Sequence, residues 1–133
     1  MLTEKLARHC DLVTAFDFSA PAALQAKTRC ASLAQVDVRC ASITDAFNGE
    51  FDLLVLSEIG YYFSRRVWQA ISWRLLDRLA PGAVVVAAHW LGTSEHHSIS
   101  GDEVHEVLRA HPGISSTLST RSQALRLDRF VRL

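Results

Sequence analysis

Phe51–Phe63 reads F-D-L-L-V-L-S-E-I-G-Y-Y-F, and this stretch decides the fold class of the chain. The apolar run Leu53–Leu56 needs cover on both faces, which indicates a parallel strand between helices rather than a half-solvated antiparallel one. Ligands of open α/β sheets bind outside the carboxyl ends of such strands. We therefore expect a ligand site where Glu58 and the two tyrosines follow the strand. In the alternative interpretation, Glu58 is a solvated loop acid and the tyrosines are packing residues at the rim.

The composition is that of an ordinary globular protein. A chain of 133 residues, 49% hydrophobic and 21% charged, predicts a single domain spanning 1–133. Fourteen basic and fourteen acidic side chains cancel, so there is no electrostatic footprint for nucleic acid or for a membrane surface. The longest apolar runs are far too short to span a membrane. Charges stand near the N-terminus where a signal peptide needs an apolar core, so we expect a cytoplasmic protein.

The three cysteines, Cys10, Cys30 and Cys40, show no C-x-x-C pairing. An odd number of unpaired cysteines in such a chain indicates reduced thiols, and no metal site is expected from them.

Helices and strands are expected to alternate along the chain. Serines at 19, 64 and 100 are expected N-caps, because a serine hydroxyl accepts a hydrogen bond from the first turn of a helix. The expected helices are 2–9, 20–29, 65–79 and 101–110. The expected strands are 12–18, 36–41, 51–57, 83–90, 115–120 and 123–131. The last two form an antiparallel hairpin, so the pattern predicts an α/β fold with a doubly wound, mostly parallel sheet that this hairpin closes.

The order of the motifs resembles class I S-adenosylmethionine-dependent methyltransferases, and within them the nodulation protein S group. The resemblance spans essentially the whole chain. It rests on L-T-E-K-L-A-R-H-C-D at 2–11, A-F-D-F-S at 15–19, S-E-I-G-Y-Y at 57–62, L-A-P-G at 79–82, H-W-L-G at 89–92 and S-G-D-E-V-H at 100–105. It implies a Rossmann-like fold, S-adenosylmethionine as cofactor, and methylation of an amine or hydroxyl of a small, sugar-like acceptor, as in nodulation oligosaccharide biosynthesis.

The resemblance also implies which residues bind the cofactor. Asp17 ends a strand, so its carboxylate can accept hydrogen bonds from ribose hydroxyls, with Phe18 beside it. Alternatively, Asp17 caps the following helix. Ser42 and Ile43 fall where the family surrounds the adenine. Ser42 replaces an acid there, which predicts weaker cofactor binding because a neutral hydroxyl loses the charge assistance of a carboxylate.

A second set of residues is expected around the methyl donor and the acceptor. Ser57 and Glu58 would contact the cofactor, with Glu58 attracting its positive sulfur or its amino group. Tyr62 and His89 are the predicted catalytic residues, because aromatic faces favour cations and a histidine can take a proton from an amine near neutral pH. In the alternative interpretation, His89 is a hydrogen-bonded wall residue. The predicted acceptor-binding residues are Tyr61, Trp90, Asp102 and His105.

The later histidines, His96, His97 and His105, lack a recognised metal-ligand spacing, and no metal is expected. We expect Glu95–Ser100 to form part of a lid over the acceptor. Asp102 and His105 would form a pair on one helix face, directed either into the pocket or toward the surface.

The resemblance places Met1 just after the glycine-rich loop that wraps the cofactor in the family. On this basis the chain is expected to bind S-adenosylmethionine poorly or not at all, and to self-associate through sheet edges left open. Two further readings stay open. One is a non-catalytic remnant or interaction module on the same scaffold. The other is a nucleotide-binding oxidoreductase-like domain, which needs a glycine fingerprint absent from this sequence.

Overall fold

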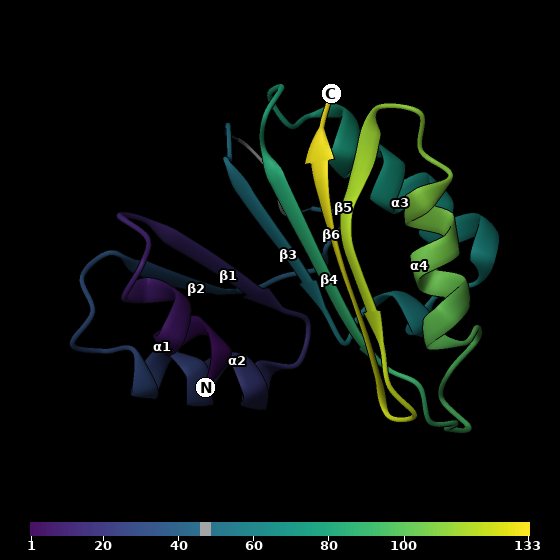
Figure 1. Ribbon diagram of the computed structural model, residues 1–133. Coiled ribbons are helices and arrows are strands. Elements are labelled where there is room, and N and C mark those ends of the chain that lie inside the picture. The colour runs from purple at the N-terminus through teal and green to yellow at the C-terminus, as the bar shows by residue number, and fades with distance from the viewer. Residues whose placement is uncertain (46–48) are drawn as a thin grey trace. The chain divides into compact units, whose positions relative to one another are not determined.

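The computed structural model describes residues 1–45 and 49–133, and it divides the chain into two compact units, Met1–Asn48 and Gly49–Leu133. Figure 1 shows the helices and strands of each unit. The first unit contains α1 (Leu2–Ala7), β1 (Val13–Asp17), α2 (Ala20–Arg29) and β2 (Val36–Cys40). The second contains β3 (Leu53–Ser57), the 3-10 helix η1 (Gly60–Tyr62), α3 (Arg65–Asp77), β4 (Val84–Trp90), α4 (Gly101–Arg109), β5 (Ile114–Arg121) and β6 (Leu125–Arg132). A single domain spanning the chain stays a prediction.

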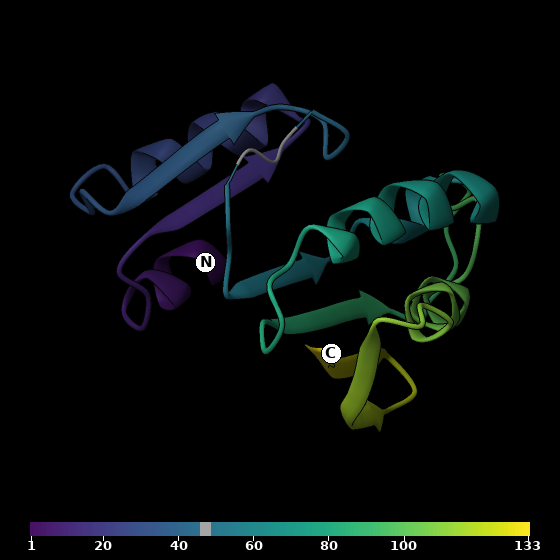
Figure 2. The same cartoon turned by 90° about the horizontal axis from the view of Figure 1, so that it is seen from above.

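The first unit is a two-stranded parallel sheet with both of its helices on one face (Figures 1 and 2). Ser19 caps α2, since its hydroxyl accepts a hydrogen bond from the amide of Ala22, and Pro21 lies in the first turn as expected. The register pairs Asp17 with Cys40, so β1 and β2 end at the same edge.

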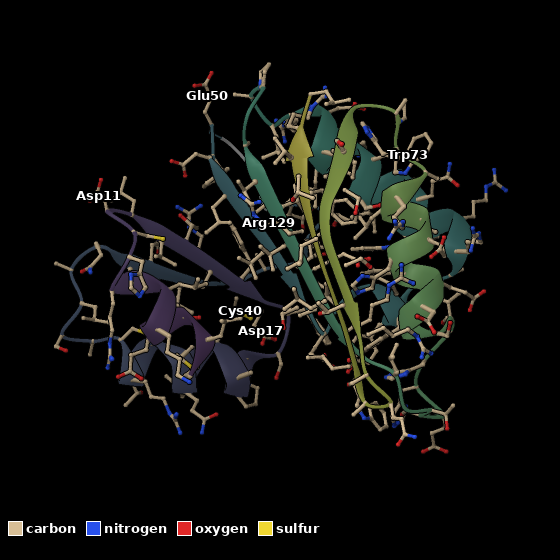
Figure 3. All side chains as sticks on the ribbon, viewed as in Figure 1. Asp11, Asp17, Cys40, Glu50, Trp73 and Arg129 are labelled. Carbon is tan, nitrogen blue, oxygen red and sulfur yellow. The ribbon has the colours of Figure 1, made fainter. Side chains whose placement is uncertain are left out.

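The second unit is a four-stranded mixed sheet in the order β3-β4-β6-β5, with α3 and α4 on one face (Figures 1 and 2). The strands β3 and β4 are parallel, and β5 and β6 form the predicted antiparallel hairpin. Two tryptophans of α3 hydrogen-bond to α4. The indole nitrogen of Trp68 donates to the carbonyl of Val104 at 3.2 Å. The indole nitrogen of Trp73 donates to the carbonyl of Val107 at 3.0 Å. Trp73 is labelled in Figure 3.

The α/β fold class and the predicted order of elements are confirmed, including the caps at Ser64 and Ser100. Two details are corrected. The strands form two hydrogen-bonded sheets rather than one. The strands β3 and β4 are fully buried on one face only, where Leu54, Leu56, Val85 and Ala87 lie, while the residues between them are half-buried. An uninterrupted apolar run in a strand therefore does not show that both faces of the strand are equally buried.

No helix in the described part of the chain has the length and apolar character needed to cross a membrane.

Candidate functional site

The chain leaves β3 through a strained residue. Glu58 has a φ of 55°, a left-handed conformation that costs a non-glycine residue about 1–3 kcal/mol. The surrounding structure holds this conformation, since the amide of Glu58 donates to the carbonyl of Ala88 at 3.0 Å. The next turn, η1, needs a glycine at position 60, because an added Cβ would lie only 2.8 Å from the indole of Trp68. The strand end is thus packed tightly and set in one conformation.

The carboxylate of Glu58 is exposed but held at both oxygens. Oε1 accepts a hydrogen bond from the amide of Trp90 at 2.8 Å, and Oε2 accepts one from the hydroxyl of Tyr61. Tyr61 is buried, and burial together with the neighbouring Glu58 carboxylate raises the pKa of its hydroxyl. Tyr61 therefore stays neutral and donates its hydroxyl proton to the Glu58 carboxylate in this hydrogen bond.

Four rings pack against one another at this strand end, and we call them the aromatic cluster: Tyr61, Tyr62, Trp90 and His97. His97 stacks on Tyr61 with ring centroids 3.8 Å apart, and both Tyr62 and Trp90 meet His97 edge-on. Tyr62 and Trp90 are 44% and 43% exposed, so the cluster presents aromatic surface to solvent beside a carboxylate. Such a combination favours a cationic ligand.

The loop between β4 and α4 completes the cluster. The amide of Ser98 donates to the carbonyl of Tyr61 at 2.7 Å, which holds the loop against η1. Ser100 and Glu103 form a reciprocal capping box that begins α4. Gly101 lets this helix approach, because a Cβ there would lie 2.6 Å from the carbonyl oxygen of Trp90. The described structure thus places the loop over η1; that it acts as a lid stays a prediction.

His97 is a residue that the sequence reasoning missed as a site candidate. Neither of its ring nitrogens hydrogen-bonds to any residue in the described ranges, and the side chain is half-buried in the aromatic cluster. Its neighbour His96 is 76% exposed and lies 3.6 Å from the carboxylate of Glu95. The sequence carried no signal that separates these two adjacent histidines, because both fall in a loop without periodicity.

His89 is fully buried, and both of its ring nitrogens are engaged. Nε2 accepts from the amides of Ile59 and Gly60 at 3.3 and 3.2 Å, and Nδ1 lies 3.1 Å from Nε2 of His105. Burial, with a smaller contribution from His105, lowers the pKa of His89 to about 3. This geometry corrects the expectation of a general base, since His89 has no accessible lone pair.

His105 and Asp102 do not form the expected pair. His105 is fully buried, and its Nδ1 lies 2.8 Å from the carboxylate of Asp128 on β6. Asp102 binds Arg121 through two nitrogens and also binds Arg126, at 3.2 Å. These arginine contacts lower the pKa of Asp102. Both ring nitrogens of His105 are engaged, which leaves it no free atom for an acceptor. Asp102 lies in a surface ion cluster, and its acceptor-binding role stays a prediction.

Four other predicted residues lie in the first unit. The carboxylate of Asp17 accepts from the amide of Ser19 at 2.9 Å, while the N-cap of α2 is Ser19 itself. Phe18 is 68% exposed. Ser42 binds within its own turn, where its hydroxyl lies 2.9 Å from that of Thr44, and Ile43 follows it half-buried. Figure 3 labels Asp17 and Cys40, which lie side by side at the end of the sheet.

Within the described ranges, no three or more histidine, cysteine, aspartate or glutamate side chains are grouped to hold a metal ion. Cys10, Cys30 and Cys40 are free thiols.

No protein-family profile matches the chain, and no curated protein matches it. Solved structures do. A protein of Pseudomonas syringae, provisionally named a methyltransferase, gives a TM-score of 0.83 at 25% identity and covers 98% of this chain and 80% of its own. The N-methyltransferase NodS from Bradyrhizobium japonicum WM9, solved with S-adenosyl-L-homocysteine, gives 0.83 at 23% identity over 98% of this chain and 71% of its own. The magnesium protoporphyrin IX methyltransferase ChlM from Synechocystis PCC 6803 gives 0.75 at 16% identity, covering 99% and 64%.

These matches confirm the predicted resemblance, including the likeness to NodS, at the level of the fold. The chain therefore has the fold of the class I S-adenosylmethionine-dependent methyltransferases.

Proposed function

We propose that this protein transfers a methyl group from S-adenosylmethionine to an amine or hydroxyl of a small, sugar-like acceptor. The observation that carries the proposal is the Glu58 carboxylate, held at the end of β3 beside the aromatic cluster in a methyltransferase fold. A carboxylate flanked by aromatic faces attracts cations, and both a sulfonium and a protonated amine are cations. The N-methyltransferase NodS among the matching structures favours an amine.

The proposed cofactor residues lie at or just after the carboxyl ends of β1, β2 and β3. Asp17 would accept hydrogen bonds from the ribose hydroxyls, since only its Oδ1 is engaged by a residue that the structure describes. Phe18, Ser42 and Ile43 would surround the adenine. Ser57 and Glu58 would hold the methionine portion. These roles follow the family resemblance, and the chemistry of each side chain fits them.

When bound, S-adenosylmethionine supplies a methyl group that its positive sulfur already activates. The protein then has to align the acceptor and exclude water. In our proposal Tyr62 and Trp90 form the exposed wall against which the acceptor lies, and Tyr61 fixes the direction of the Glu58 carboxylate.

We assign the removal of the acceptor proton to His97 rather than to His89. The ring of His97 lies in the aromatic cluster with no bonded nitrogen among the described residues, whereas both nitrogens of His89 are engaged. His97→Gln should depress methyl transfer to a protonated amine most strongly near neutral pH, where an imidazole can still accept the proton. His96→Gln, one residue away and exposed, is the matched control and should leave the pH profile unchanged. Equal profiles for both variants would remove His97 from the mechanism.

The test of the proposed function compares Glu58→Gln with Glu95→Gln. Transfer of labelled methyl from S-adenosylmethionine to glucosamine, with glucose as the hydroxyl counterpart, measures the reaction. Loss of the Glu58 charge should weaken it about 10- to 100-fold, because hydrogen bonds to charged groups contribute about 1.5–3 kcal/mol. Glu95 is 87% exposed and its variant should keep full activity. Neither cofactor binding nor transfer in the unaltered protein would favour the alternative, a non-catalytic scaffold.

The resemblance extends the proposal to a cytoplasmic step of nodulation-type oligosaccharide biosynthesis. Isotope tracing of the methyl group into an oligosaccharide fraction tests this extension.

We also propose self-association through sheet edges. Within the described ranges, β1 pairs only with β2 and β3 pairs only with β4, so each presents one open edge. Open edges are templates for pairing with another chain. Light scattering should give at least a dimer mass, and a stable monomer at high concentration would refute the proposal.

A further inference from the structure

Three buried side chains connect the core of the second unit to the Glu58 turn, and we call His89, His105 and Asp128 the buried triad. All three are fully buried, and they come from β4, α4 and β6. Their hydrogen bonds run in sequence, from Ile59 and Gly60 to His89, from His89 to His105, and from His105 to Asp128. Burying three polar side chains costs free energy unless every one is paired, and here all are.

The direction of every hydrogen bond in the triad follows from two backbone amides. An amide N–H can only donate, so Nε2 of His89 must carry a lone pair. The proton of neutral His89 is then on Nδ1 and is donated to Nε2 of His105. His105 therefore carries its own proton on Nδ1 and donates it to the carboxylate of Asp128. No other arrangement of neutral or protonated rings satisfies all the contacts.

The Asp128 end of the triad is anchored. Its carboxylate also accepts from the hydroxyl of Ser119 and from Nε of Arg126, at 3.1 Å for the latter. Burial would raise the pKa of Asp128, but the bonds from Ser119 and His105 and the charge of Arg126 lower it. Asp128 is therefore ionised and fixes the orientation of His105.

The other end of the triad holds the candidate site. The amides of Ile59 and Gly60 directly follow Glu58, whose left-handed φ has to be maintained by its surroundings. We infer that the buried triad is a positioning device: Asp128 and His105 fix the tautomer of His89, whose Nε2 holds the turn that directs the Glu58 carboxylate toward Trp90 and Tyr61. The inference rests on the proposed function only in giving that carboxylate a ligand.

Nitrogen NMR of the unaltered protein tests the first part without any ligand. At pH 7 both His89 and His105 should be neutral and protonated on Nδ1. A proton on Nε2 of His89, or a charged ring at either position, would overturn the inference.

Two substitutions of His89 test the second part. The oxygen of glutamine in His89→Gln reaches the place of Nε2 and can accept from the two amides. Asparagine in His89→Asn places its nitrogen near Nδ1, so it keeps the donor to His105 and loses the acceptor. The readout is hydrogen exchange at the amide of Trp90, which donates to Glu58. His89→Asn should speed this exchange about tenfold more than His89→Gln, which corresponds to about 1.4 kcal/mol of local opening.

His111→Asn is the matched control, since His111 is also a buried histidine paired with a carboxylate, that of Asp77 at 3.0 Å. It should change global stability without selective exposure of Trp90. If Trp90 exchange in His89→Asn simply follows global stability, the triad is structural and the positioning role is refuted. Because exchange needs no cofactor, this result is independent of whether methyl transfer is found. Should His89→Asn fail to fold, the tautomer measurement still decides the arrangement on which the role depends.

Discussion

Two carboxylates stand at the carboxyl ends of parallel strands, Asp17 in the first unit and Glu58 in the second, and they are held in different ways. Asp17 accepts from an amide two residues along the chain. Glu58 accepts from the amide of Trp90, 32 residues away, and the turn behind it is bound to the buried His89. A hydrogen bond between residues close in sequence stabilises only the local turn. A hydrogen bond between residues far apart in sequence fixes the turn to the core. The second strand end is therefore preorganised by the tertiary fold and the first is not.

The hydrophobic cores of the two units also differ, in the size of their buried side chains. The buried side chains of the first unit are small: Ala7, Ala23, Cys30 and Val38. The largest fully buried side chains, which include Trp68, Tyr61 and Phe130, all belong to the second unit. Large buried side chains contribute more to stability because burial free energy follows the apolar area removed from water. We therefore expect the strand end at Glu58 to be rigid and the strand end at Asp17 to be adaptable.

Lowering the pH should reduce the stability of the second unit, and this is the largest effect that we expect. The pKa of His89 is lowered to about 3, so below its usual value near 6.5 the unfolded chain binds a proton that the folded protein does not. Stability then falls as the pH falls, by about 2.7 kcal/mol at about pH 4.5 for His89 alone. Burial, which outweighs the nearby Asp128 carboxylate, lowers the pKa of His105 and adds to the loss.

Urea unfolding followed by tryptophan fluorescence measures this loss, because all three tryptophans lie in the second unit. Urea midpoints that stay constant between pH 7 and pH 4.5 would contradict neutral, buried histidines.

The fold was predictable where signals are local. The serine caps at 19, 64 and 100 and the hairpin at the C-terminus follow from capping chemistry and strand patterning, and the structure confirms them. The division into two sheets was not foreseen, since local propensity does not say which strands pair.

The site was predictable only as a set of residue types at strand ends. Glu58 and its tyrosines were identified because they follow a strongly apolar strand. The role of Asp128 was missed, since β6 reads L-R-L-D-R-F-V-R and an aspartate in such a strand looks solvent-exposed. Its burial depends on a histidine 23 residues earlier, which no local pattern reveals. For the same reason His89 and His105 were assigned to ligands instead of to each other.

Substitutions of Asp17 test whether the strand end of the first unit binds the ribose. Asp17→Ala should weaken binding of S-adenosylhomocysteine by about 1.5–3 kcal/mol, the contribution of hydrogen bonds to a charged group. Asp17→Asn keeps an acceptor for the amide of Ser19 while removing the charge, so it separates the ribose contact from the local turn. Asp11→Ala, an exposed acid of the same unit labelled in Figure 3, is the control. Unchanged affinity in Asp17→Ala would exclude the ribose role.

Ser42→Asp should give the smallest effect, a gain of about 1 kcal/mol in cofactor affinity from a charge-assisted hydrogen bond to the adenine amino group. Because Ser42 already binds the hydroxyl and amide of Thr44, part of the new charge will be taken up within the turn. Thr44→Val releases that competition and should enlarge the gain. Calorimetric titration measures both variants, and a loss of affinity in Ser42→Asp would place the adenine elsewhere.

We propose that residues at the ends of β1, β2 and β3 bind S-adenosylmethionine. The most direct measurement is an amide NMR titration of the 133-residue chain with S-adenosylhomocysteine, which detects even weak binding. We expect weak but saturable shifts at 17–18, 42–43 and 57–62, with small movement of the turn that His89 holds. No shifts up to the solubility limit would contradict this proposal.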